Sequence, residues 1–320
     1  MSELLVLTPG MGIGPEVTLR ALENVGSKNV VLVGRRDSIR AVPTTLELVD
    51  ITDINDRLEG TDRIGLLDPG DRDEPCEVAS IRLAAEACLS GDADGMVTGP
   101  IHKARLRERG FQFMGHTDFL GDICNASPVM GFVGGSLRVV LVTTHAPLAD
   151  ISRLVTKNRV SYTVRTAHSA LVHSLGLVRP KIAICGLNPH AGEGGLLGSE
   201  DSREILPAVR GLQEEGIDCR GPMGAESAFL AAMRGEFDLV VAMYHDQGLA
   251  PLKAVDFGRS VNWSMGLPIL RVSVDHGTAD DLVGKQKADP GSMESAIALA
   301  RSITSSIPSK ISAEDKHHRP

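Results

Sequence analysis

The sequence has 320 residues, of which 42% are apolar and 23% charged, a balance that is ordinary for a globular protein with room for two domains. Its formal net charge is −8 and its aromatic content is 3%, which argues against a nucleic-acid-binding surface. Five widely spaced cysteines form no CxxC pair, so neither a disulfide framework nor a thiolate zinc site is expected.

The first residues, MSELLVLTPG, lack the pattern of a signal peptide. No apolar run approaches the length of a membrane span. We therefore expect a cytoplasmic protein that has no membrane partner.

Short runs of Val, Ile and Leu alternate along the chain with amphipathic stretches. LLVLT precedes a helical pattern at 15–25, NVVLVG precedes one at 36–42, and GMVTG precedes one at 102–109. Farther along, RVVLVTT, KIAICGL and LVVAMY each precede a helical pattern or a Gly-rich loop. Such runs are typical of largely parallel strands that are buried on both faces. The sequence therefore predicts an α/β fold with crossover helices.

The segment TPGMGIGPE places glycines between a strand and a helix, as dinucleotide-binding loops do. Gly10, Gly12 and Gly14 alternate and so depart from the GxGxxG spacing, while Pro15 suits the first turn of the following helix. No acidic residue clearly closes a ribose-binding βαβ unit. We therefore predict that the chain has no classical Rossmann site.

Three histidines follow predicted strands: His145 after RVVLVTT, His190 after KIAICGLNP and His245 after DLVVAMY. Ligands of open parallel sheets bind beyond the carboxyl ends of the strands, and three neutral imidazoles can hold a divalent metal. For one histidine alone, a hydrogen bond to a local carbonyl is the simpler interpretation. For three at equivalent strand ends, a metal site is an equal alternative. Asp246 and Glu193 are candidates to orient two of the rings, although Glu193 equally fits a surface position.

Two further segments carry residues that suit an anionic ligand. GHTDFLG places His116 and Thr117 at a predicted helix start, where Thr117 could cap the helix and backbone N–H groups favour an anion. Lys253, Asn262 and Arg271 could hold a phosphate or a carboxylate. Without further context, a solvated histidine and isolated surface cations explain the same residues.

A series of segments resembles the signature stretches of the 4-hydroxythreonine-4-phosphate dehydrogenase family: HTDFLG, TTHAPL, GLNPHAGEGG, YHDQGLAPLK and VDHGTADDLVGKQKADPGS. The resemblance runs from about residue 95 to residue 300. It implies oxidation of the C3 hydroxyl of 4-phosphooxy-L-threonine by NAD or NADP, with decarboxylation to 3-amino-2-oxopropyl phosphate. That reaction belongs to pyridoxal 5'-phosphate synthesis.

The same resemblance implies roles for residues of this chain. His145, His190 and His245 would bind a divalent metal (Zn, Mg or Co) at a site completed across a homodimer interface. The substrate-binding residues would be His116, Thr117, Lys253, Asn262 and Arg271. No residue is assigned as the general base.

DHGTADDLVGKQKADP also resembles the adenosine-binding loop of isopropylmalate and isocitrate dehydrogenases. The implied fold has two α/β/α domains: residues 1–112 plus 276–320 on the cofactor side, and residues 113–275 for metal, substrate and dimerisation. The implied cofactor-binding residues are His276, Gly277, Thr278, Ala279 and Asp289. A helix-capping turn is the alternative interpretation of this loop.

Two departures from the family pattern affect the expected substrate. The usual Asp-Pro-Ala-Gly segment is replaced by PGMGIGPE, which lacks the Asp, and Glu226 stands where Asp is usual. A dehydrogenase of another 4-phosphorylated acid, such as threonate or erythronate 4-phosphate, is therefore an alternative function. Dehydrogenation of a cyclic dihydrodiol, zinc-dependent hydrolysis and a non-catalytic metal-binding role fit the motifs less well.

Overall fold

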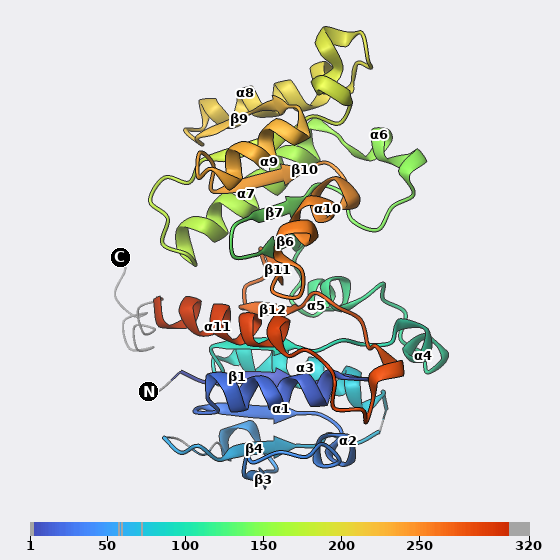
Figure 1. Cartoon of the computed structure of the whole chain (residues 1–320), viewed down its shortest axis with the longest axis vertical. Helices are drawn as coiled ribbons and strands as arrows, with labels where there is room; N and C mark the ends of the chain where they lie inside the picture. The colour runs from blue at the N-terminus through green and yellow to red at the C-terminus, as the bar shows by residue number, and fades with distance from the viewer. Residues whose placement is uncertain (1–2, 57, 59, 72, 307–320) are drawn as a thin grey trace, which may run out of the picture.

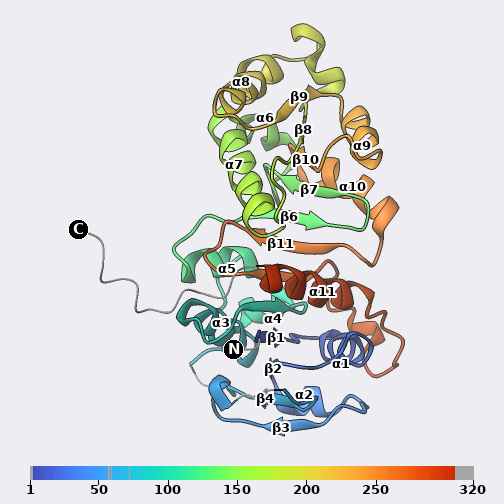
Figure 2. The same cartoon turned by 90° about the vertical axis from the view of Figure 1, so that its left-hand side faces the viewer.

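The computed structural model describes residues 3–306 except residues 57, 59 and 72, and these residues form an α/β protein. Within them, one sheet of 12 strands runs through the whole length of the molecule in the order β3-β4-β2-β1-β5-β12-β11-β6-β7-β10-β8-β9. Helices cover both faces of the sheet (Figures 1 and 2). The predicted α/β class is confirmed.

The first half of the sheet consists of parallel strands, which Figure 1 shows in its lower part. Its strands are β1 (Leu5–Thr8), β2 (Val30–Val33), β3 (Leu48–Asp50), β4 (Ile64–Leu67), β5 (Gly95–Thr98) and β12 (Arg271–Val274). The helices are α1 (Gly14–Val25), α2 (Arg36–Arg40), α3 (Cys76–Ser90), α4 (Lys103–Glu108), α5 (His116–Ile123) and α11 (Gly291–Ser306). The predicted helices at 15–25, 36–42 and 102–109 match α1, α2 and α4.

The second half, in the upper part of Figure 1, contains the parallel set β7, β10, β8 and β9. Its strands are β6 (Val129–Val133), β7 (Arg138–Leu141), β8 (Ile182–Cys185), β9 (Cys219–Met223), β10 (Leu239–Ala242) and β11 (Val261–Met265). Its helices are α6 (Ile151–Leu154), α7 (Lys157–His173), α8 (Leu206–Glu214), α9 (Ala225–Met233) and α10 (His245–Asp256).

The strands are largely parallel, as predicted, but the centre of the sheet is mixed. There β6 is antiparallel to β7 and to β11, and β11 is antiparallel to β12. The pairs β6–β7 and β11–β12 are hairpins, because loops as short as 134–137 and 266–270 leave no room for a crossover helix. Since β11 and β12 lie in the middle of an unbroken sheet, the division into two domains stays a prediction.

The strands are buried on both faces, as their apolar composition predicts. All four residues of β1, β2, β8 and β10 are buried, and α3, α7 and α11 pack their apolar sides on the sheet. In the described part of the chain, no helix is long and apolar enough to cross a membrane.

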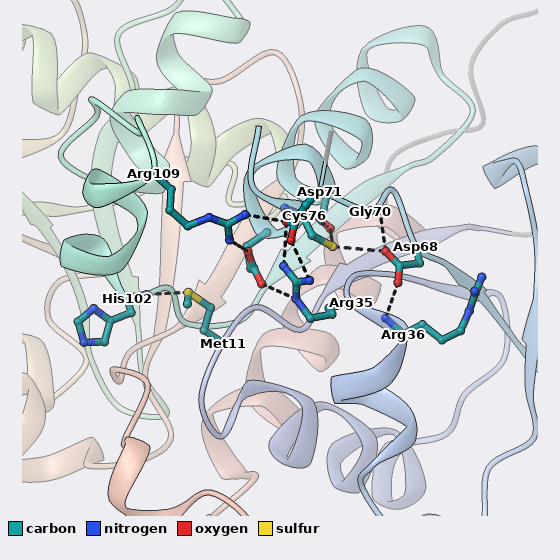
Figure 3. Close-up of polar contacts among 11 residues, drawn as sticks. Met11, Arg35, Arg36, Asp68, Gly70, Asp71, Cys76, His102 and Arg109 are labelled. Carbon is teal, nitrogen blue, oxygen red and sulfur yellow. Dashed lines mark hydrogen bonds and ion pairs between the residues drawn. The ribbon is translucent and has the colours of Figure 1, made fainter. Parts of the chain in front are cut away.

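An ion-pair network fastens the C-terminal end of α4 to the first half of the sheet (Figure 3). Arg35, just after β2, forms a bidentate pair with Asp71, with N–O distances of 2.9 and 3.1 Å, and its Nε lies 3.1 Å from Glu77. Arg109, at the end of α4, reaches the same Asp71 carboxylate at 2.9 Å. The backbone N–H of Cys76 also donates to Asp71 at 2.8 Å. One carboxylate thus joins β2, α3 and α4.

Replacing Asp71 with asparagine should lower the free energy of unfolding at pH 7 by about 1 kcal/mol or less, since the side chain is partly exposed. Hydrogen bonds from Arg35, from the Cys76 N–H and from Arg109 hold the pKa of Asp71 well below its ordinary range. A depressed carboxyl pKa stabilises the fold above the unfolded-state value of about 4, and this stabilisation fades as the pH falls. Urea unfolding at pH 7 and pH 3 checks this, with Asp37→Asn as the exposed control. An equal loss at both pH values would contradict it.

Candidate active site

A cavity of about 730 Å³ is lined by both halves of the sheet. Segments that lie far apart in the sequence contribute to it, namely the ends of β5, β7 and β12, the first turns of α4, α5 and α10, and one side of α7. All five predicted substrate residues line it: His116, Thr117, Lys253, Asn262 and Arg271. Two of the three strand-end histidines line it as well. Folding therefore gathers most of the candidate residues in one place.

His145 and His245 lie side by side, with ring centroids 5.6 Å apart. They meet because β7 and β10 are parallel neighbours in which Leu141 pairs with Ala242. Beyond the strands, the Thr143 hydroxyl donates to the Met243 carbonyl at 2.7 Å and keeps the two chains together. Positions four residues after Leu141 and three after Ala242 thus bring two imidazoles to the same cavity.

Both rings are suited to bind a metal. Burial, with the charges of Lys103 and His245, lowers the pKa of His145, which favours the neutral imidazole that a metal requires. His245 Nδ1 lies 2.7 Å from Asp246 Oδ1, which leaves Nε2 for a ligand. A carboxylate in that position fixes the tautomer of a metal-binding histidine.

His190 lies outside this cavity and is exposed. Its backbone is left-handed at φ 52°, and Ala191 and Glu193 follow at φ 53° and 43°. Left-handed residues other than glycine are strained, so such a run is rare. Within the described residues, no three His, Cys, Asp or Glu side chains are grouped to hold a metal. One chain thus brings together two of the three predicted ligands, and metal binding stays a prediction.

The chain that leads to His190 is held firmly at the end of β8. Buried Asp201 accepts hydrogen bonds from the backbone N–H groups of Leu187 and Asn188 at 2.8 and 3.1 Å. Gln247 in α10 donates to the Gly186 carbonyl at 2.7 Å and accepts from the N–H of Met243 at 2.6 Å. The strand ends before His190 and His245 are therefore fixed to each other.

Arg271 is an unusual residue of the cavity, because its cationic side chain is buried, with only 2% exposed. Its guanidinium donates to the hydroxyls of Ser264 at 3.0 Å and Thr98 at 2.7 Å, while its Nε has no acceptor. In the described part of the chain it forms no ion pair with a carboxylate, and burial lowers its pKa to about 9. A buried cation that is paired only with neutral hydroxyls is costly, so this site favours an anionic ligand.

Further polar atoms at the cavity have no hydrogen-bond partner among the described residues. His116 Nε2, Asn262 Oδ1 and His276 Nε2 are buried without a hydrogen bond among the described residues. Burial, followed by the charges of Arg271 and Lys103, holds the pKa of His116 well below its ordinary value, so this ring is neutral. Buried polar atoms normally have a partner, and a polar ligand can supply it here.

Helix α5 begins at His116, as the sequence predicts, but the expectation that Thr117 caps it is wrong. Gly115 occupies the N-cap position and makes no side-chain hydrogen bond, while Thr117 lies in the first turn. The first N–H groups of a helix have no intrahelical acceptor. This uncapped end faces the cavity, since Gly115, His116 and Thr117 all line it.

Lys253 differs from Arg271 because it has a counter-ion. Its ammonium lies 3.4 Å from Asp275, which also accepts a hydrogen bond from Ser260 at 2.8 Å. The pair lines the cavity but contributes little net charge to it. Its predicted role in substrate binding is not tested by this geometry.

Several residues that line the cavity were missed by the sequence analysis: Lys103, Asp118, Arg159, Tyr162 and Asp275. Thr98 and Ser264, which hold Arg271, were also missed. Lys103 carries a signal in the sequence, because it lies five residues after the predicted strand GMVT. The strand-end rule that indicated the histidines would also have indicated this lysine. The hydroxyls carry no comparable sequence signal.

The predicted cofactor loop lies between two cavities. His276 and Gly277 line the first, while Asp280, Gly284 and Gln286 line a second cavity of about 660 Å³. The Gly-rich segment after β1 supports the loop, because the Ile13 N–H donates to the Thr278 carbonyl at 2.9 Å. A Cβ on Gly12 would overlap that carbonyl, which explains the glycine.

The individual residues of the loop serve the fold in part. Asp289 Oδ1 accepts a hydrogen bond from the Gly291 N–H at 2.9 Å and so caps the start of α11, as the alternative interpretation of the loop expects. Ala279 adopts a left-handed conformation at φ 40°. Cofactor binding by His276, Gly277, Thr278, Ala279 and Asp289 stays a prediction.

Glu226, at the position where Asp is usual, lies in the first turn of α9. Burial, with a smaller contribution from Glu226, raises the pKa of the Cys185 thiol to about 12. Helix α9 packs on β8, and Glu226 lies outside the lining of the 730 Å³ cavity.

Comparison with known proteins gives a consistent result. The sequence model of the pyridoxal phosphate biosynthetic protein PdxA matches residues 20–300. A 4-hydroxythreonine-4-phosphate dehydrogenase of Stenotrophomonas maltophilia is 40% identical over 93% of this chain and 96% of its own length. The crystal structure of the enzyme of that name from Klebsiella pneumoniae is similar with a TM-score of 0.85, at 32% identity over 95% of this chain and 98% of that chain. A terephthalate 1,2-cis-dihydrodiol dehydrogenase from Burkholderia xenovorans is more distant, with a TM-score of 0.64 and 27% identity over 94% and 98%.

Proposed function

Because this chain belongs to the PdxA family of pyridoxal phosphate biosynthetic proteins, we propose that it is a 4-hydroxythreonine-4-phosphate dehydrogenase whose reaction takes place in the 730 Å³ cavity. The reaction removes a hydride from C3 of the substrate, and the resulting β-keto acid then loses carbon dioxide. The observation that carries this proposal is the buried Arg271, which faces the cavity and finds only hydroxyl partners in the described chain. A substrate with an anionic group would supply the missing counter-charge.

The remaining residues of the cavity would fix the orientation of the substrate. Arg271 would bind the phosphate, helped by His116 and by the N–H groups at the start of α5. Asn262 and Lys253 would contact the groups nearer to β11. Holding the substrate at several points keeps C3 in one position, which is a large part of the rate advantage.

The proposal of a metal site is supported by the adjacent His145 and His245 rings. The third ligand would be His190 of a second subunit. A divalent cation such as Zn, Mg or Co held there would lower the pKa of the substrate hydroxyl and stabilise the charge that develops on its oxygen. Asp246 would keep the His245 ring in the tautomer that presents Nε2.

A homodimer is supported by exposed apolar side chains close to the histidines. Leu148, three residues after His145, is 73% exposed, and Leu196, six residues after His190, is 83% exposed. Exposed leucines at these places fit a surface that a second copy covers. Each active site would then be completed across that contact.

NAD or NADP is the proposed hydride acceptor. The loop 276–286 borders both cavities, which suits a dinucleotide whose nicotinamide and adenosine lie in different pockets. No Rossmann fingerprint is required for this arrangement.

Steady-state rates on a panel of phosphorylated four-carbon acids test the proposal. We expect 4-phosphooxy-L-threonine to give the highest kcat/KM, with NADH formation that depends on added metal. The panel also contains threonate 4-phosphate, erythronate 4-phosphate and a carboxylated cis-dihydrodiol. A higher kcat/KM on a sugar acid would transfer the assignment to that substrate. NADH formation only from the dihydrodiol would contradict a phosphorylated substrate.

A further inference from the structure

A second cation of the cavity, Lys103, has no counter-ion among the described residues. It is the first residue of α4 and lines the cavity that contains Arg271. In the described part of the chain it forms no ion pair, whereas Lys253 is neutralised by Asp275. His116 and His145 line the same cavity as Lys103.

The Lys103 side chain crosses the uncapped start of α5. A Cβ built on Gly115 would lie 3.3 Å from Lys103 Cε and 3.5 Å from its Nζ. Glycine at the N-cap therefore leaves the space that the lysine occupies. The backbone of Gly115 is extended, so an alanine there would meet the lysine without backbone strain.

Three sources of positive potential thus line one cavity: the Arg271 guanidinium, the Lys103 ammonium and the N-terminal end of α5. A phosphate monoester carries a charge of about −1.5 to −2 at pH 7, which two cations balance. A helix N-terminus adds N–H donors that point at an anion. The buried Nε of Arg271 and Nε2 of His116 have no partner among the described residues and could hydrogen-bond to phosphate oxygens.

We propose that Lys103 is a further phosphate-binding residue, which encloses the phosphate of the substrate together with Arg271 and the start of α5. The inference rests on the proposed function, since it assigns a residue to the phosphate of that substrate. Its role is to select phosphorylated substrates through an ionic contact that reaches across Gly115.

Binding of inorganic phosphate to the full-length protein, measured by calorimetry without metal or NAD, tests this inference directly. Lys103→Met should weaken phosphate binding by about ten-fold or more, because a charge-assisted contact is lost. Lys103→Arg should retain most of the affinity, and Gly115→Ala should give an intermediate loss by displacing the lysine. Lys157→Met is the matched control, since Lys157 is an exposed first residue of α7 away from the cavity lining. That control should bind phosphate as the wild type does.

Kinetics separate this role from a structural one. Lys103→Met should raise KM for the phosphorylated substrate with little change in kcat. The kcat and KM for the unphosphorylated analogue should stay as in the wild type. If Lys103→Met binds phosphate as tightly as the wild type while Arg271→Ala does not, the assignment of Lys103 is wrong and the proposed function stands. If the wild type itself binds no phosphate, the phosphorylated substrate and this inference both fail.

Discussion

Replacing His190 with alanine should lower both metal content and turnover, although His190 lies outside the cavity that contains His145 and His245. We expect kcat/KM to fall by about 100-fold or more, since loss of a residue that only supports a metal ligand already costs 10–100-fold. Metal content by mass spectrometry of the purified protein, measured beside steady-state rates, checks both effects. Normal metal content and normal turnover in this variant would remove His190 from the site.

Subunit exchange tests whether the third ligand comes from a second copy. A dimer of one His190→Ala chain and one His245→Ala chain would contain one intact site and one that lacks two ligands. Random exchange of equal amounts makes half of the dimers mixed, so about a quarter of wild-type activity should return from two inactive variants.

The structure supplies a matched control for this experiment. His145 and His245 lie together in a single chain, so a mixture of His145→Ala and His245→Ala chains contains no intact site in any dimer. That mixture should stay inactive after exchange. Recovery in the control, or none in the first mixture despite proven exchange, would contradict a site shared in this way.

The contrast between these histidines shows what the sequence could predict. The strand-end rule correctly placed His145 and His245 together, because their strands are parallel neighbours in register. The same rule did not predict where His190 lies, since the chain after β8 enters a left-handed turn and leaves the cavity. Whether a loop turns toward or away from a site depends on tertiary contacts such as those of Asp201, which local sequence patterns do not show.

The centre of the sheet shows a second limit of prediction from sequence. Alternating strands and helices predicted parallel pairing, and this holds on both flanks. The antiparallel pairs β6–β7 and β11–β12 follow from short connections that the apolar pattern alone does not distinguish from crossovers. This central region carries Asn262 and Arg271, so the part of the sheet that was predicted least well holds two residues of the proposed substrate site.

Arg271→Ala should lower kcat/KM for a phosphorylated substrate, mainly through a higher KM. The decrease should correspond to a loss of roughly 2–4 kcal/mol in transition-state stabilisation. The reason is burial: at 2% exposure, the guanidinium would meet the proposed phosphate with little competition from water. Lysine at this position should restore part of the loss, because it returns the charge but lacks the bidentate geometry of arginine. The matched substrate is the unphosphorylated analogue, for which the variant and the wild type should differ little.

Stability measurements separate binding from folding in the same variant. A buried guanidinium whose only partners among the described residues are Ser264 and Thr98 contributes little to the fold, because no opposite charge there offsets its desolvation. Arg271→Met, which preserves volume, should therefore unfold at the same temperature as the wild type or at a higher one while losing phosphate affinity. If Arg271→Met is destabilised, or if Arg271→Ala is impaired equally on both substrates, then Arg271 serves the fold or a carboxylate. The preference for a phosphorylated substrate over a dihydrodiol would then lose its main support.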